Sequence, residues 1–126
     1  MARYITIILI LSTLLTAKHF RLEREYQKIF CEKVKGEVEY ILPDHTRVDC
    51  QTSTYSFEVD FGHKAFEAVG QALYYSMITG KKAGIVLIQE TKADNRYIGR
   101  IKPLVKKYNI TLFIINKELQ IRKIRD

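Results

Sequence analysis

Acidic residues in the middle of the chain have the spacing of side chains on two neighbouring strands. Glu58 and Asp60 lie in the segment 54–61, whose β-branched and aromatic residues predict a strand. Because side chains alternate along a strand, both carboxylates point to the face opposite the apolar residues of that segment. Asp49 lies on the preceding predicted strand, 47–52, and adds a third carboxylate. Such a group could hold a hard cation such as Mg²⁺, whereas acids on the outer face of a hairpin would merely be solvated.

A polar stripe follows on the next predicted helix. Lys64, Glu67, Gln71 and Tyr75 stand at i, i+3, i+7 and i+11, which places them on one side of that helix. With the carboxylates they suit metal-assisted phosphodiester hydrolysis, in which a cation lowers the pKa of bound water and stabilises charge on phosphate oxygens. Lys64 would orient or acidify that water, and Gln71 and Tyr75 would hold water or substrate through hydrogen bonds.

The ordered set of these residues resembles the PD-(D/E)XK nuclease superfamily, and it is most similar to small bacterial members with a QxxxY helix. The matching segments are RVDC at 47–50, FEVDF at 57–61, HKAFEAVGQALYY at 63–75 and GIVLI at 84–88. The resemblance implies a metal-dependent nuclease with Mg²⁺ or Mn²⁺ as cofactor and nucleic acid, expected to be DNA, as partner. It implies a catalytic set of Asp49, Glu58, Lys64, Gln71 and Tyr75, of which the two acids would bind the metal.

One position departs from the pattern of the superfamily. That pattern places a lysine two residues after the second acid, where this chain has Asp60. Lys64 could return its ammonium to the same place, as migrated lysines do in the superfamily. Otherwise Asp60 would be an added metal ligand, or the protein would be an inactive relative. An acid on the first helix often completes such sites, and Glu25 is the candidate metal ligand there. Its rivals are Glu23, Glu37 and Glu39.

Hydrophobic periodicity and turn residues predict an α/β domain with a mixed central β-sheet flanked by helices. The predicted helices cover residues 19–33, 63–79 and 95–108, and the predicted strands cover 38–42, 47–52, 54–61, 83–89 and 110–116. The order α-β-β-β-α-β-α-β agrees with the restriction-endonuclease-like core that the resemblance implies. Asn95 is the expected cap of the last helix, in which Pro103 predicts a kink or an early end.

The first 17 residues predict a separate segment, either a signal peptide or an N-terminal membrane anchor. Arg3 precedes the uncharged run 5–17, which has signal-peptide length but is short for a membrane span. A buried N-terminal helix is the alternative, although the run is apolar on all sides. Residues 18–126 would then be the single nuclease-like domain of an exported protein, either periplasmic or tethered to the inner membrane through residues 5–17.

Two cysteines, Cys31 and Cys50, are the only ones in the chain. In an exported protein an even number permits one disulfide. In a cytosolic protein the two would be small core residues instead.

Basic residues are concentrated in the C-terminal third of the chain. The net charge is +7, from 21 Lys and Arg against 14 Asp and Glu. Residues 1–80 hold nine basic and ten acidic residues, whereas residues 81–126 hold twelve and four. On a nuclease these cations would contact the phosphate backbone, and the alternative for each is a solvated helix face. The alternative function is a catalytically inactive nuclease-fold module that binds nucleic acid or a protein partner in the cell envelope.

Overall fold

Three α-helices and six strands make up the part of the chain that the structure describes. The computed structural model describes residues 19–125. Its helices are α1 (Glu23–Lys33), α2 (Ala65–Thr79) and α3 (Asn95–Lys107), with the 3₁₀ turns η1 (Gly62–Lys64) and η2 (Lys92–Asp94). Its strands are β1 (Glu37–Ile41), β2 (Arg47–Gln51), β3 (Tyr55–Phe61), β4 (Lys82–Gln89), β5 (Thr111–Asn116) and β6 (Ile121–Lys123).

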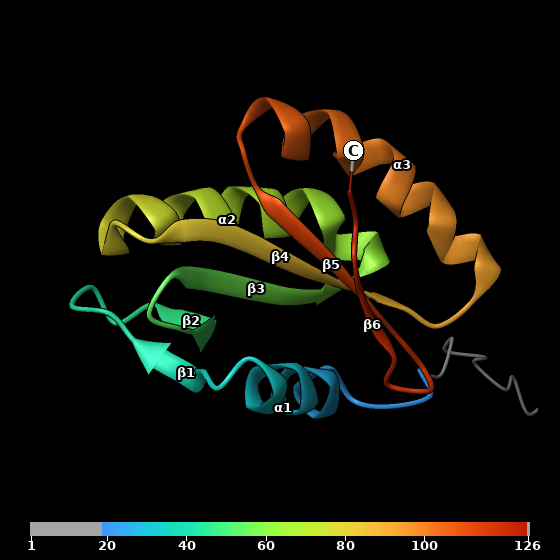
Figure 1. The fold of residues 1–126 in the computed structure, drawn as a ribbon, viewed down its shortest axis with the longest axis horizontal. Coiled ribbons are helices and arrows are strands. Elements are labelled where there is room, and N and C mark those ends of the chain that lie inside the picture. The colour runs from blue at the N-terminus through green and yellow to red at the C-terminus, as the bar shows by residue number, and fades with distance from the viewer. Residues whose placement is uncertain (1–18, 126) are drawn as a thin grey trace, which may run out of the picture.

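The six strands form one sheet in the order β1-β2-β3-β4-β5-β6. β1, β2 and β3 form an antiparallel meander, β3, β4 and β5 are parallel, and β6 returns antiparallel to β5. Both β-α-β connections advance in the same direction across the sheet, which places α2 and α3 on one face, while α1 covers the other (Figure 1). The predicted α/β class, with a mixed sheet flanked by helices, is therefore confirmed.

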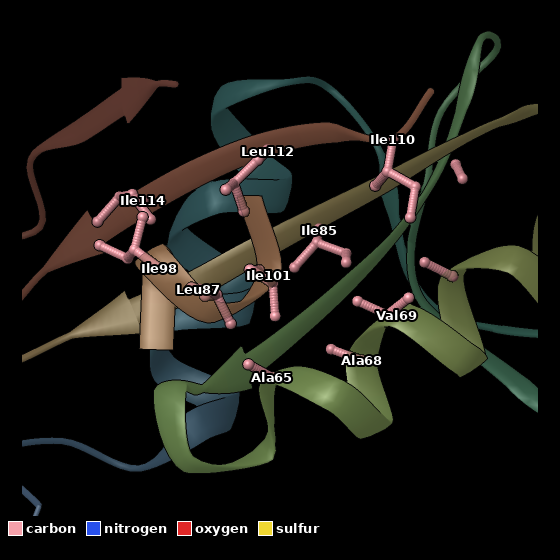
Figure 2. Packing of buried hydrophobic residues seen from close by; sticks show 12 residues of the cluster. Ala65, Ala68, Val69, Ile85, Leu87, Ile98, Ile101, Ile110, Leu112 and Ile114 are labelled. Carbon is pink, nitrogen blue, oxygen red and sulfur yellow. The ribbon is translucent and has the colours of Figure 1, made fainter. Parts of the chain in front are cut away.

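Two apolar clusters hold the helices on the sheet. On one face, Ala68 of α2 and its neighbours pack against Ile85 and Leu87 of β4, and α3 closes the cluster (Figure 2). On the other face, Phe30 of α1 packs edge-on against Phe57 of β3, with ring centroids 4.9 Å apart. β4 is covered on both sides, which explains why its sequence is a continuous apolar run rather than an alternating one.

Helix α1 begins at Glu23 and not at residue 19. The N–H of Leu22 donates to the Glu25 carboxylate (3.0 Å), and the N–H of Glu25 donates to the backbone oxygen of Leu22 (3.0 Å); these two bonds fix the start of the helix. The residues before the helix are bonded to the end of β4 instead, where the N–H of Phe20 donates to the carboxylate of Glu90 (2.9 Å).

Helix α3 and strand β6 also differ from the prediction. The capping box before α3 is formed by Thr91 and Asp94, and Asn95 is already the first helical residue. The helix continues past Pro103 to Lys107, because the carbonyl that proline leaves unbonded belongs to exposed Gly99, where solvent can satisfy it. Strand β6 was not predicted, since its three residues are too few to show a period.

The predicted leader or anchor, residues 1–17, lies outside the described residues. Within residues 19–125, no helix is long and apolar enough to cross a membrane. The domain boundary at residue 18 therefore stays a prediction.

A disulfide joins α1 to the sheet. Cys31 of α1 and Cys50 of β2 are bonded, with 5.6 Å between their Cα atoms, and both side chains are buried. Gly36 passes so close to the bond that a Cβ at that position would lie 2.5 Å from the Sγ of Cys50. The two cysteines are thus paired, which is the first of the two arrangements considered from the sequence.

Candidate functional site

The site begins where strand β2 separates from strand β3. The antiparallel register pairs Gln51 with Ser56 and Cys50 with Phe57, and it goes no further. At the next step the Oδ2 atom of Asp49 accepts the N–H of Val59 (2.8 Å), so a side chain takes the place of the neighbouring strand's carbonyl. The backbone N–H of Asp49 in turn lies 3.5 Å from the Oε1 atom of Glu58. The split between the strands therefore brings two acids together.

Glu58 and Asp60 point from β3 toward the α2 face of the sheet, as strand alternation predicts. The side chains that alternate with them along β3 belong to the cluster under α1 on the opposite face; these are Phe57, Val59 and Phe61. Only 3% of Glu58 and 6% of Asp60 are exposed, so the view that these acids are merely solvated on a hairpin surface is wrong. Burying an ionised carboxylate is costly unless a partner compensates its charge.

The acids perturb one another. Burial raises the pKa of Glu58 to about 10, and the negative charge of Asp49 adds to the effect. Burial likewise raises the pKa of Asp49 to about 6, against the opposing hydrogen bond from Val59. Burial and the negative charge of Glu23 raise the pKa of Asp60 to about 8. Each acid therefore lies close enough to another to alter its ionisation: Asp49 acts on Glu58, and Glu23 acts on Asp60.

Among the acids considered from the sequence, the structure brings Glu23 of helix α1 to the cluster, whereas the first candidate, Glu25, lies away from it. Glu25 is exposed and its carboxylate caps its own helix at Leu22. Glu23 shares the inward stripe of α1 with the buried residues Tyr26 and Gln27, which lie three and four positions later. That spacing was the signal in the sequence that separates the two glutamates.

Lys64 does reach the acids from the start of α2. Its Nζ atom lies 3.9 Å from the Oε2 atom of Glu23, and its positive charge opposes the rise in the pKa of Asp60. Within residues 19–125, Lys64 is the basic residue that forms an ion pair with an acid of the cluster. One lysine cannot compensate four carboxylates.

Tyr75 also belongs to the cluster, and Gln71 lies beside it. Tyr75 is buried against Leu42 and Val48. Burial raises the pKa of its phenol, and the negative charges of Glu58 and Asp49 add to the effect, so the ring lies within electrostatic range of these acids. Gln71 is half-buried one turn earlier on the same stripe, and no hydrogen bond ties its side chain to the described residues. The structure thus brings together Asp49, Glu58, Asp60, Lys64 and Tyr75, with Gln71 at the margin.

Gln27 is a residue that the sequence reading missed. Its buried amide donates to the backbone oxygen of Asp49 (2.7 Å) and to the carboxylate of Glu39 (2.9 Å). It thereby fixes β2 at the point where this strand leaves β3. Its place on the buried stripe of α1 was the available signal, because a buried glutamine needs a polar partner.

Glu90, at the end of β4, forms a second group that the sequence did not reveal. Its carboxylate accepts hydrogen bonds from the Tyr26 hydroxyl (2.7 Å) and the Phe20 N–H (2.9 Å), and it lies 2.7 Å from the Nδ1 atom of His19. Burial alone would raise the pKa of Glu90, but the hydrogen bonds from Tyr26 and His19 outweigh it and lower the pKa. This group is fully partnered, so it secures the residues before α1 and is not the candidate catalytic site.

The donor set of the first cluster fits a hard divalent cation. Carboxylate oxygens are the ligands that Mg²⁺ and Mn²⁺ prefer, and the buried charges lack sufficient positive compensation. Within residues 19–125, no three His, Cys, Asp or Glu side chains are yet placed as a formed cage around a metal ion. Because the pKa values of Asp49, Glu58 and Asp60 are raised, a bound cation would have to displace protons from these acids.

Comparison with protein-family models, with curated proteins and with solved structures finds no match to this chain.

Proposed function

We propose that this chain is a metal-dependent nuclease of the PD-(D/E)XK type, which hydrolyses phosphodiester bonds in nucleic acid. The observation that carries the proposal is the convergence of Asp49, Glu58 and Asp60 with Glu23 and Lys64 in the gap between β2 and β3. The order of helices and strands supports the finer assignment to a restriction-endonuclease-like fold.

Each side chain has a role that follows from its place. Asp49 and Glu58 would hold Mg²⁺ or Mn²⁺, with Asp60 and Glu23 as further oxygen donors. When bound, the cation supplies a water of lowered pKa and stabilises negative charge on the phosphate. Lys64, at the exposed rim, would orient the attacking water or a phosphate oxygen through its ammonium. The reaction consumes one water and leaves a phosphate monoester and an alcohol, so it needs no further reactant.

Tyr75 and Gln71 support that site from helix α2. The buried Tyr75 packs with Leu42 and Val48, and its phenol is within electrostatic range of Glu58 and Asp49. Gln71, closer to the surface, would hydrogen-bond water or substrate. Neither residue is needed to hold the cation, so substitutions there should lower activity less than loss of an acid.

The test is a cleavage assay with the full-length chain. Labelled single-stranded, duplex and branched DNA and RNA are incubated with Mg²⁺ or Mn²⁺, and products are separated on denaturing gels. Asp49→Asn and Glu58→Gln keep the shape and the hydrogen-bonding oxygen of each side chain but remove the charge. We expect each to lower activity by more than about 100-fold, a larger loss than removal of an outer-shell partner causes.

Glu118→Gln is the matched control, because it removes one exposed carboxylate from the turn after β5. Its activity should equal that of the original chain. If no substrate is cut with either metal, the proposed enzyme activity is wrong. If cutting survives both Asp49→Asn and Glu58→Gln, the site is wrong although the activity stands.

A catalytically inactive module of the same fold is the second candidate, binding nucleic acid or a protein partner in the cell envelope. It is favoured by Asp60, which occupies the place of the motif lysine, and by the proximity of the Lys64 ammonium to Glu23. Binding without cleavage would support it over the enzyme. A steep fall of affinity with salt would then identify nucleic acid as the partner, and a flat response a protein.

A further inference from the structure

Two arginines at the start of α3 are fixed around one aromatic ring. The guanidinium carbon of Arg96 lies 4.7 Å from the centroid of the Tyr97 ring, and that of Arg100 lies 5.5 Å from it. The Nη2 atom of Arg96 also donates to the Tyr97 hydroxyl (2.7 Å). Both arginines are exposed, so their remaining N–H groups face solvent from defined positions.

This arginine–tyrosine group lies beside the acidic cluster because of Gly62. A Cβ at Gly62 would lie 2.5 Å from the Cδ2 atom of Tyr97, so only glycine lets the ring pack on η1. Gly62 is two residues from Asp60 in one direction and two residues from Lys64 in the other. The arginines are therefore anchored next to the candidate site.

Helix α3 carries its positive charges on two separate sides. Arg96, Arg100 and Lys107 stand at i, i+4 and i+11 and share one stripe. Lys102 and Lys106 stand on another side, where they line a hollow beside the C-terminal residues Lys123 and Arg125. The helix thus offers two exposed cation pairs of equal charge, of which only the arginine pair is fixed on Tyr97 beside η1.

We propose that Arg96 and Arg100, held by Tyr97, bind the phosphate backbone of the nucleic acid next to the acidic cluster; this inference rests on the proposed function. The ionised acids of the cluster repel a polyanion, and cations beside them favour its approach. The arginine fork matches two phosphate oxygens at once, and stacking on a ring reduces the conformational freedom lost on binding. The contact positions the strand and reads no bases.

The test measures binding and not cleavage. The full-length chain is titrated into fluorescein-labelled single-stranded and duplex DNA in EDTA, and anisotropy is followed over about 50–200 mM salt. The variants are Arg96→Ala/Arg100→Ala and, as the control of equal charge on the same helix, Lys102→Ala/Lys106→Ala. We expect the arginine variant to bind at least about tenfold more weakly than the original chain. The plot of log affinity against log salt should be less steep by about 2, because two phosphate contacts are lost. The lysine variant should lose much less.

Two further variants test the fixed geometry. Tyr97→Leu keeps the charge and an apolar side chain, and it should weaken binding because the arginines lose their support. Arg96→Lys/Arg100→Lys keeps the charge but loses the fork, and it should fall between the original chain and the alanine variant. Circular dichroism melts check that each variant is folded.

Three results would overturn the inference. These are equal losses for the arginine and lysine pairs, unchanged binding in the arginine variant, or a chain that binds neither oligonucleotide. None of them decides the proposed enzyme activity, because the cleavage assay and its Asp49 and Glu58 variants are read separately.

Discussion

Asp49 shows how one side chain serves both the fold and the candidate site. Its carboxylate satisfies the N–H of Val59, which β2 no longer reaches, and its backbone oxygen binds Gln27. A substitution to alanine would therefore leave a buried N–H without a partner as well as removing a charge. Asp49→Asn separates these effects, because its amide oxygen can still accept the hydrogen bond.

Glu58→Gln should stabilise the metal-free protein at neutral to alkaline pH. Burial and the charge of Asp49 raise the pKa of Glu58 to about 10, so ionisation is unfavourable in the folded state. Below about pH 4 the carboxyl is neutral in both states and the variant should gain nothing. Near pH 8 the variant should be more stable by about 1–3 kcal/mol, or several degrees in Tm, measured by thermal melts in EDTA. Glu118→Gln should melt as the original chain does, and equal melting of Glu58→Gln and the original chain near pH 8 would contradict the prediction.

At the scale of elements, helix α1 positions the strand that carries Asp49. Gln27 hydrogen-bonds the backbone of Asp49, and the disulfide from Cys31 attaches to Cys50, the next residue along β2. Glu23, on the same helix, brings its carboxylate to Asp60. α1 is thus linked to the site through Gln27, Cys31 and Glu23, of which the sequence led us to expect only a contribution from an acid.

Removal of the disulfide should weaken this attachment. In Cys31→Ala/Cys50→Ala the loop that the bond closes becomes unconstrained in the unfolded chain, and we expect a loss of about 2–4 kcal/mol in the free energy of unfolding. Urea unfolding of the variant and of the original chain, each with and without reductant, measures the loss. Reductant should destabilise the original chain and leave the variant unchanged; an original chain that is no more stable than the variant would refute the role of the bond.

At the scale of the whole molecule, opposite charges are separated. The acids gather between β2, β3 and the start of α1, while the C-terminal third carries most of the basic excess. If acidic and basic residues were evenly mixed, each negative charge would have a positive charge near it. The observed one leaves buried negative charge in one place, where a cation would be stabilised, and exposed positive charge beside it.

The stability of the whole protein should therefore depend on pH and on divalent cations together. The pKa values of Asp49, Glu58 and Asp60 are all raised, so the folded state holds more protons than the unfolded state as soon as the pH exceeds about 4. Stability should be greatest in acid and decline from about pH 4 upward; the contribution of Asp49 to this decline ends near pH 6, that of Asp60 near pH 8 and that of Glu58 near pH 10. Mg²⁺ or Mn²⁺ should restore it at the upper end and have little effect near pH 4.

Melts across this pH range, with the metal or with EDTA, give the comparison. Asp49→Asn/Glu58→Gln serves as the control, because its stability should no longer respond to the cation. A metal-free chain that becomes more stable toward alkaline pH would show that the acids are not the groups that govern its pH dependence.

The order of elements could be predicted from the sequence, because hydrophobic period, glycine stops and turn residues are local signals. Gly80 ends α2 in the left-handed conformation, with φ of 70°, as its place after the helical run predicts. Two elements were not predicted correctly. The three residues of β6 are too few to show a period. The start of α1 depends on a local bond from Leu22 to Glu25 and on the distant carboxylate of Glu90, which binds Phe20. Of the candidate site, the sequence predicted those residues that lie together on one element, such as Glu58 and Asp60 on β3.

The sequence by itself determined which side chains share a face. Strand alternation placed Glu58 and Asp60 together, and helical spacing placed Lys64, Gln71 and Tyr75 on one stripe. Only the tertiary structure decided which faces meet. It split β2 from β3 at Asp49, brought Glu23 and not Glu25 to Asp60, and set Tyr97 on Gly62 beside them. The reason is physical: faces follow from the local backbone period, whereas contacts between distant residues depend on how the packed layers close over one another.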